Sequence, residues 1–356
     1  MTIRWSRAAL AALVLLALVL AAGCDRKPRL VPASADSTRA TRRDTLAATV
    51  ERVRNAWEQG AVDGSVANST ANLVLADLRL HPLLPLGVRA RSFLDSLSLG
   101  AEVNGGDDLI VVNFFSLSDP SGGSWPHLFW RDTVTVRTQP VEGSGMRLGG
   151  VATRADTTGG GMQAAGLFTR NATAGPQPLV FVWRRAPKAR QWTLAQTLGP
   201  DSLGGIGTAH FVPTPGDSGA LVTRTWQRTP GFEECPSCPH VYVTRRFRWG
   251  REGFSTLSSQ LEDAPYVSFV RLIQALMIPD LDVARDYVTD NTVFDSARAY
   301  GLGERHGAWR LAPGGDEVPS QMTFFRGPRE AYRVTFARFG GRWRVSRIES
   351  TAHSIE

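Results

Sequence analysis

Cys235 and Cys238, separated by two residues, form the most specific local motif in this 356-residue sequence. Cysteines at this spacing can form a disulfide, act as a redox-active dithiol or supply half of a metal site. Thioredoxin-like chemistry requires the first cysteine at a helix N-terminus, where the helix dipole stabilises the thiolate. Here the motif lies between two expected strands, and the preceding Glu233 and Glu234 disfavour a thiolate. The motif therefore favours a structural loop disulfide, with a redox role and a metal role as alternatives.

Metal and haem chemistry have weaker support in the sequence. The six histidines form no paired metal-ligand spacing. A structural zinc site needs four ligands, and only His240 and the two glutamates lie near the cysteine pair. Covalent haem attachment requires a histidine directly after the second cysteine, where this chain has Pro239. We therefore expect neither a metal nor another cofactor.

A second group of candidate residues lies near the C-terminus. His306 is the only histidine in the region expected to form the C-terminal sheet, and Asp295 and Tyr300 would reach the same pocket if that region encloses one. A lone histidine in such a setting is more often structural than catalytic. We therefore assign these three residues to a candidate pocket and give no residue a catalytic role.

The first 24 residues indicate where the protein works. Arg4 and Arg7 precede an unbroken apolar run from Ala8 to Ala22, and small residues lead directly to Cys24. The run is shorter than the roughly 20 residues of a membrane-spanning helix. It is typical of a removable secretory segment. The alternatives are an ordinary secretory signal, with Cys24 only a free thiol, and an uncleaved membrane anchor.

The stretch Leu20-Ala21-Ala22-Gly23-Cys24 resembles the bacterial lipoprotein signal with its lipobox. The resemblance implies that cleavage leaves Cys24 as a lipidated N-terminus, whose acyl chains tether the protein to a membrane that it does not span. It also implies the cell envelope, on a periplasmic or surface-facing side. Asp25 resembles an inner-membrane retention signal, but that rule differs between lineages, so the choice of membrane stays open. Cys235 and Cys238 then remain as a pair, which suits an oxidising compartment.

The composition predicts a folded protein with basic surfaces. Hydrophobic residues make up 42% of the chain, which is enough to build cores, and the formal net charge is +7. Nearly all basic residues are arginines, and the densest groups include Arg184-Arg185 and Arg245-Arg246-Arg248-Arg251. Both groups lie in alternating, strand-like sequence, so we expect solvated strand faces and no nucleic-acid partner.

The chain divides by pattern into a signal peptide (1–23), a lipidated N-terminus with a polar tether (24–43), a β-rich domain that begins with helices (44–260) and an α+β domain (265–356). From about residue 107 to 257, short β-like segments such as Leu109–Phe115 and Leu128–Thr138 alternate with turn residues. The sequence therefore predicts a multidomain α+β protein. Its antiparallel β-rich middle domain is expected to be a sandwich, a barrel or a partial propeller.

In the last domain, helical segments precede several strand candidates, and Gly340-Gly341 joins the final two as a hairpin. This order resembles the cone-shaped nuclear-transport-factor-two-like α+β fold. In that fold a curved sheet and helices enclose a pocket, which some members use for catalysis and many for binding.

These patterns predict a lipid-anchored envelope protein with a non-catalytic binding or structural role. Its partner, beyond the membrane, would be another envelope protein or a small-molecule ligand. One alternative makes the C-terminal pocket with His306, Asp295 and Tyr300 the site of a small-molecule enzyme. Another makes Cys235 and Cys238 an envelope thiol–disulfide centre.

Overall fold

The computed structural model describes residues 47–116, 123–133, 135–142, 145–155, 160–214, 217–278, 280–305, 307–312, 320–327 and 329–351. The predicted signal and tether, with Cys24, lie outside these residues, and so does His306. The fold is a mixed α+β fold, as predicted. It divides into two compact units, Met1–Arg147 and Leu148–Glu356. None of the helices in the described ranges is long and apolar enough to cross a membrane.

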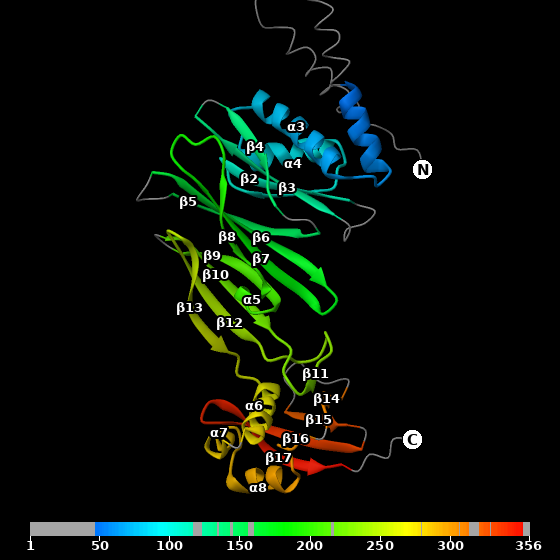
Figure 1. The fold of residues 1–356 in the computed structure, drawn as a ribbon, viewed down its shortest axis with the longest axis vertical. Helices are drawn as coiled ribbons and strands as arrows, with labels where there is room; N and C mark the ends of the chain where they lie inside the picture. Colours follow the sequence, from blue (N-terminus) through cyan, green and yellow to red (C-terminus); the bar gives the residue numbers. More distant parts are fainter. Residues whose placement is uncertain are drawn as a thin grey trace, which may run out of the picture. The chain divides into compact units, whose positions relative to one another are not determined.

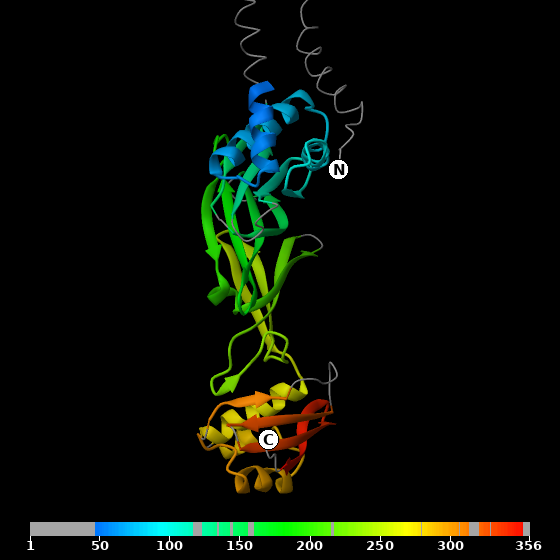
Figure 2. The same cartoon turned by 90° about the vertical axis from the view of Figure 1, so that its right-hand side faces the viewer.

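The first unit consists of helices packed on one face of a four-stranded sheet (Figures 1 and 2). A helix at residues 47–58 is followed by α3 (Gly64–Leu80) and α4 (Leu86–Ser96). The sheet is an antiparallel meander of β1 (Ala101–Gly105), β2 (Leu109–Phe115), β3 (Ser124–Arg131) and β4 (Val136–Pro140). Its core joins apolar side chains of the helices, such as Trp57 and Val74, to Ile110 and Phe129 of the sheet.

Two local features of this unit differ from the sequence prediction. Helix α3 was not predicted, although Asp63 caps it by accepting a hydrogen bond from the Val66 backbone nitrogen over 2.8 Å. The predicted single strand Leu128–Thr138 is wrong, because the chain turns where the Asp132 backbone nitrogen donates to the carbonyl of Thr135 over 2.7 Å. That turn separates β3 from β4.

The second unit begins with a β-sandwich. One sheet has the order β5-β6-β7-β8 and the other the order β13-β12-β10-β9, with the short helix α5 (Pro200–Leu203) between β8 and β9. The strands are β5 (Arg147–Ala155), β6 (Met162–Ala172), β7 (Gly175–Arg185), β8 (Thr193–Leu198), β9 (Ile206–Thr214), β10 (Asp217–Trp226), β12 (Val243–Gly250) and β13 (Gly253–Leu261). Leu167 and Val180 of one sheet share a core with Phe247 and Trp249 of the other. Of the three predicted architectures, the described strands form the sandwich and no closed barrel.

The C-terminal part of this unit places three helices before a sheet. These helices are α6 (Pro265–Met277), α7 (Leu281–Arg285) and α8 (Asn291–Ala299). The strands β14 (Trp309–Leu311), β15 (Gln321–Arg326), β16 (Glu330–Phe339) and β17 (Arg342–Ser350) form an antiparallel meander. The Gly340-Gly341 hairpin joins β16 to β17 as predicted, since Phe339 pairs with Arg342.

One segment from the sandwich region joins the C-terminal sheet. Between β10 and β12 the chain forms β11 (Phe232–Glu233), which pairs in parallel with β14 (Figure 1). Phe232 packs into the C-terminal core, edge-on to the ring of Phe269 at 6.4 Å. The segment that carries Cys235 and Cys238 is therefore held against the C-terminal core, although its sequence neighbours on both sides are sandwich strands.

Candidate binding site

The structure describes two of the three residues predicted for a C-terminal pocket, and it places both at the surface. Asp295 lies on the exposed side of α8. Tyr300 follows α8 as its C-terminal cap and is 37% exposed, with its ring 5.7 Å from that of Tyr332. His306 lies outside the described residues, so its role stays a prediction.

Aromatic side chains occupy the interior between α6 and the C-terminal sheet. The rings of Phe269 and Phe324 stack with centroids 3.9 Å apart, and Trp309 meets Phe269 edge-on at 5.2 Å. Both phenylalanines are fully buried. This packing stabilises the sheet against the helix and does not favour an enzyme site in that space.

The cysteine pair lies in the loop after β11. The two sulfur atoms are 2.13 Å apart, at disulfide distance, and the Cys238 backbone nitrogen donates to the carbonyl of Cys235 over 3.0 Å. Cys235 is exposed and is followed by a turn, not by a helix. The helix dipole that lowers the pKa of a redox-active cysteine is therefore missing at this position.

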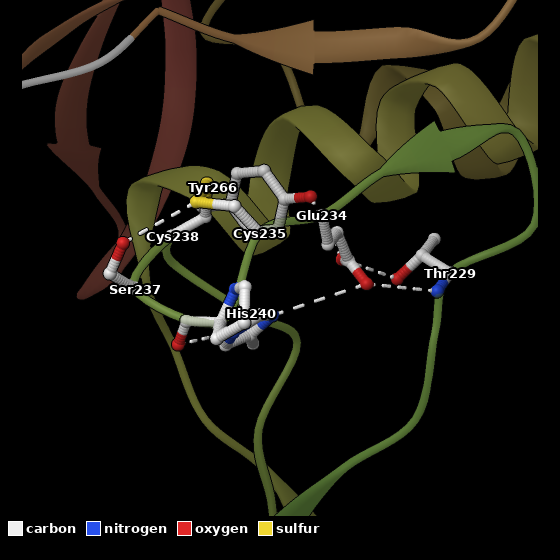
Figure 3. Close-up of polar contacts among 8 residues, drawn as sticks. Thr229, Glu234, Cys235, Ser237, Cys238, His240 and Tyr266 are labelled. Carbon is white, nitrogen blue, oxygen red and sulfur yellow. Dashed lines mark hydrogen bonds and ion pairs between the residues drawn. A yellow bond between two sulfur atoms is a disulfide. The ribbon is translucent and has the colours of Figure 1, made fainter. Parts of the chain in front are cut away.

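Glu234, directly before the disulfide, anchors a buried polar cluster (Figure 3). Its Oε1 accepts hydrogen bonds from the hydroxyls of Thr229 and Tyr266, each over 2.9 Å. Its Oε2 accepts a third from the Thr229 backbone nitrogen over 3.1 Å. The side chain is only 2% exposed, so these three donors take the place of water around its carboxylate. The cluster thereby ties the loop to α6, which supplies Tyr266.

His240 covers the other side of this carboxylate. Its Nδ1 lies 4.0 Å from Oε2 of Glu234, and its ring stacks on Trp226 with centroids 3.5 Å apart. Burial lowers the pKa of His240, against smaller opposing effects from the Pro236 carbonyl and the Glu234 charge. The imidazole is therefore neutral at neutral pH.

The pKa of Tyr266 is raised, whereas that of His240 is lowered. Burial raises its pKa far above the ordinary value of 10.0, and the charge of Glu234 and the hydrogen bond to it raise the pKa further. The hydroxyl therefore stays protonated and remains a donor to Glu234 throughout the neutral range. His240 and Tyr266 are consequently both uncharged around the one carboxylate.

A pocket of about 160 Å³ opens beside this cluster. One wall consists of Trp226, which stacks on His240, and Thr229, which is hydrogen-bonded to Glu234. Helix α6 forms another wall with Val270, Arg271 and Gln274. The remaining polar lining includes Arg228 and Arg245. The pocket thus brings together residues at the end of β10, the start of β12 and helix α6.

Sequence reasoning missed both the glutamate cluster and the pocket. Glu234 was considered only for its effect on the neighbouring cysteine and as a candidate zinc ligand, and Arg245 only as one of a run of strand arginines. One sequence signal could have distinguished Arg245 from the neighbouring arginines. Side chains alternate along β12, which places Arg245 and Arg246 on opposite faces of the sheet.

Among the described residues, no three His, Cys, Asp or Glu side chains gather closely enough to hold a metal ion. A comparison of the sequence with protein-family models found no match, and a search among curated proteins also found none.

Proposed function

We propose that this chain is a lipid-anchored protein of the bacterial cell envelope with a binding role. In this proposal Cys24 carries the lipid, and the second unit holds a small ligand in the pocket formed by β10, β12 and α6. The observation that carries the binding role is the lining of that pocket, where arginine, threonine and glutamine side chains converge beside Trp226 and several valines. Polar side chains beside apolar surface can fix the orientation of a small ligand.

The ionisable groups beside the pocket support binding more than catalysis. The side chains of Glu234 and His240 are 2% and 1% exposed, so a ligand in the pocket does not reach them. Their hydrogen bonds and stacking hold the pocket wall at Thr229 and Trp226. The Cys235–Cys238 disulfide directly follows Glu234 in the sequence. These groups act as a support for the pocket.

The anchor rests on the N-terminal residues. Arg4 and Arg7 before an apolar run, and small residues before Cys24, are the features of a lipoprotein signal. Several acyl chains on one cysteine give stable attachment, since each buried methylene contributes about 0.8 kcal/mol. The unknown partner of the anchored protein is then a small molecule or another envelope protein.

Mass spectrometry of the mature N-terminus tests the anchor. The full chain is expressed in a bacterial host, and its membrane fraction is compared with that of Cys24→Ala. We expect a lipidated Cys24 as the first residue, and we expect the variant to lose its acyl chains and its membrane attachment. An unmodified Cys24, or a different first residue, would refute the lipid anchor.

A further inference from the structure

We propose that the pocket beside Trp226 binds a small ligand through a carboxylate or phosphate group, held by Arg228, Arg245 and Arg271. This inference rests on the proposed binding role, because it names the class of ligand for the same pocket. It follows from the charge balance of the lining, the surroundings of Arg245 and the size of the apolar walls.

Among the described residues, the lining carries three arginines and no acidic residue. No carboxylate of the described part of the chain forms an ion pair with any of the three. Arg224, two residues before the end of β10, provides the contrast, because its Nε and Nη2 lie 2.6 and 2.8 Å from the carboxylate of Glu262. Arg245 and Arg271 are only partly exposed, and partly enclosed cations without a counter-charge are unfavourable. An anionic ligand would supply that charge.

Glu234 does not neutralise the pocket. Its carboxylate oxygens already accept hydrogen bonds from the pocket residue Thr229 and from Tyr266. Even if its full negative charge is counted, the three arginines leave the site with a net positive charge. The electrostatic preference of the site is therefore for an anion.

Arg245 is held in position by a hydrogen bond that leaves further N–H groups of its guanidinium for a ligand. Its Nη1 donates to Oγ1 of Thr225 over 3.1 Å, and Thr225 in turn donates to the Leu203 carbonyl over 3.0 Å. Gly204, at φ +97°, leaves room for the guanidinium, because a Cβ there would lie 1.7 Å from Nη1. A guanidinium has five N–H donors and binds a carboxylate or phosphate with two of them at once.

The rest of the lining sets the size of the ligand. Trp226, Pro230, Val241, Val243 and Val270 provide apolar surface next to the arginines. The volume of about 160 Å³ is below the roughly 300 Å³ of pockets for drug-sized molecules. The ligand is therefore a small anion with a short apolar body.

Calorimetric titration of the full chain in detergent tests this inference. Benzoate and phenyl phosphate serve as anionic probes, benzamide as the neutral analogue of benzoate, and inorganic phosphate as an anion without an apolar body. We expect one of the two aromatic anions to bind at least about tenfold more tightly than benzamide, the factor for one lost charge-assisted hydrogen bond. Binding is also expected to weaken as salt is raised.

Three variants locate the interaction. Arg245→Gln is expected to weaken binding of the anion about tenfold. Arg228→Gln is expected to weaken it as well, and this exposed side chain contributes no described hydrogen bond to the fold, so folding of the variant is not at risk. Arg246→Gln is the matched control, because Arg246 is the next residue on β12 and is exposed on the opposite face. We expect it to bind like the unchanged protein.

The outcomes separate this inference from the proposed function. If benzamide binds as tightly as both benzoate and phenyl phosphate, the anion preference is wrong but the binding role stands. If no probe binds, or if Arg246→Gln weakens binding as much as Arg245→Gln, the inference is overturned, while the lipid anchor is judged separately at Cys24. Binding of inorganic phosphate alone as tightly as phenyl phosphate supports the anion and removes the requirement for an apolar body.

Discussion

The hydroxyl of Tyr266 donates a hydrogen bond to Oε1 of Glu234 over 2.9 Å. Tyr266 lies in the first turn of α6, whereas Glu234 directly follows β11, so the bond joins two segments that are distant in the sequence. The Glu234 side chain is 2% exposed, and water cannot readily replace a lost donor there. The pair is therefore a sensitive point for the stability of the second unit.

Tyr266→Phe removes this donor without changing the shape of the ring. We expect the free energy of unfolding to fall by about 1–3 kcal/mol, the cost of leaving a buried polar group without one of its partners. Urea unfolding followed by circular dichroism measures the loss. Tyr300→Phe is the matched control, because Tyr300 is 37% exposed, and its loss is expected within about 0.5 kcal/mol. Equal losses for the two variants would contradict a role for the bond.

The stability of the protein at alkaline pH tests the raised pKa of Tyr266. The pKa of Tyr266 is raised far above 10.0 in the fold, so above about pH 10 the unfolded chain releases a proton that the folded chain keeps. The free energy of unfolding should therefore fall as the pH rises past 10. We expect Tyr266→Phe to lose less stability than the unchanged protein between about pH 9 and 11. Parallel pH profiles for the two proteins would show that Tyr266 does not titrate as described.

Sequence patterns were most informative for features that lie within one short segment of the chain. The seven residues of Leu109–Phe115 form a strand with the predicted bounds, since an apolar run interrupted only by Asn113 ends at turn residues on both sides. The hairpin at Gly340-Gly341 was likewise predicted from a local signal, a Gly-Gly pair between two strand candidates. The close spacing of Cys235 and Cys238 likewise indicated a disulfide, and their sulfur atoms lie at disulfide distance.

The features that were missed depend on contacts between distant segments. β11 has only two residues, and its pairing with β14 joins positions that no local pattern relates. The glutamate cluster depends on that pairing, because β11 holds Glu234 near Tyr266. The pocket depends in addition on α6 lying against residues after β10. Helix α3 was missed for a different reason, since its polar Asn and Ser residues conceal a buried stripe that includes Ala67, Val74 and Leu78.

Acidic pH should reveal the buried imidazole of His240. Burial lowers its pKa below 6.5, so as the pH falls through 6.5 the unfolded chain takes up a proton before the folded chain does. Stability is therefore full above 6.5 and decreases as the pH falls from 6.5 towards the folded-state pKa. NMR titration of the imidazole protons, assigned with His240→Phe, measures the value directly. A midpoint at or above that of the same signal in urea-unfolded protein would contradict the burial effect.

Phe269 is expected to be critical for the C-terminal core. It is fully buried, stacks on Phe324 at 3.9 Å and meets Trp309 at 5.2 Å, so Phe269→Ala leaves a cavity that these rings cannot fill. We expect a loss of about 3–5 kcal/mol. Phe339→Ala, at a position 53% exposed, serves as the control with an expected loss below about 1 kcal/mol. Urea unfolding distinguishes the two, and a loss below about 1 kcal/mol for Phe269→Ala would contradict the packing.

The disulfide and the Tyr266 bond should depend on each other, because Cys235 directly follows Glu234. Replacing both Cys235 and Cys238 with serine opens a very short loop, for which chain entropy alone predicts a loss of about 2 kcal/mol. Once the loop is open, Glu234 is free to move towards water, so removing the Tyr266 hydroxyl should then cost less than it does in the intact protein. A double-mutant cycle of the cysteine pair and Tyr266→Phe measures this coupling, expected at about 0.5 kcal/mol or more. Losses that add within about 0.3 kcal/mol would show that the disulfide does not hold Glu234 beneath Tyr266.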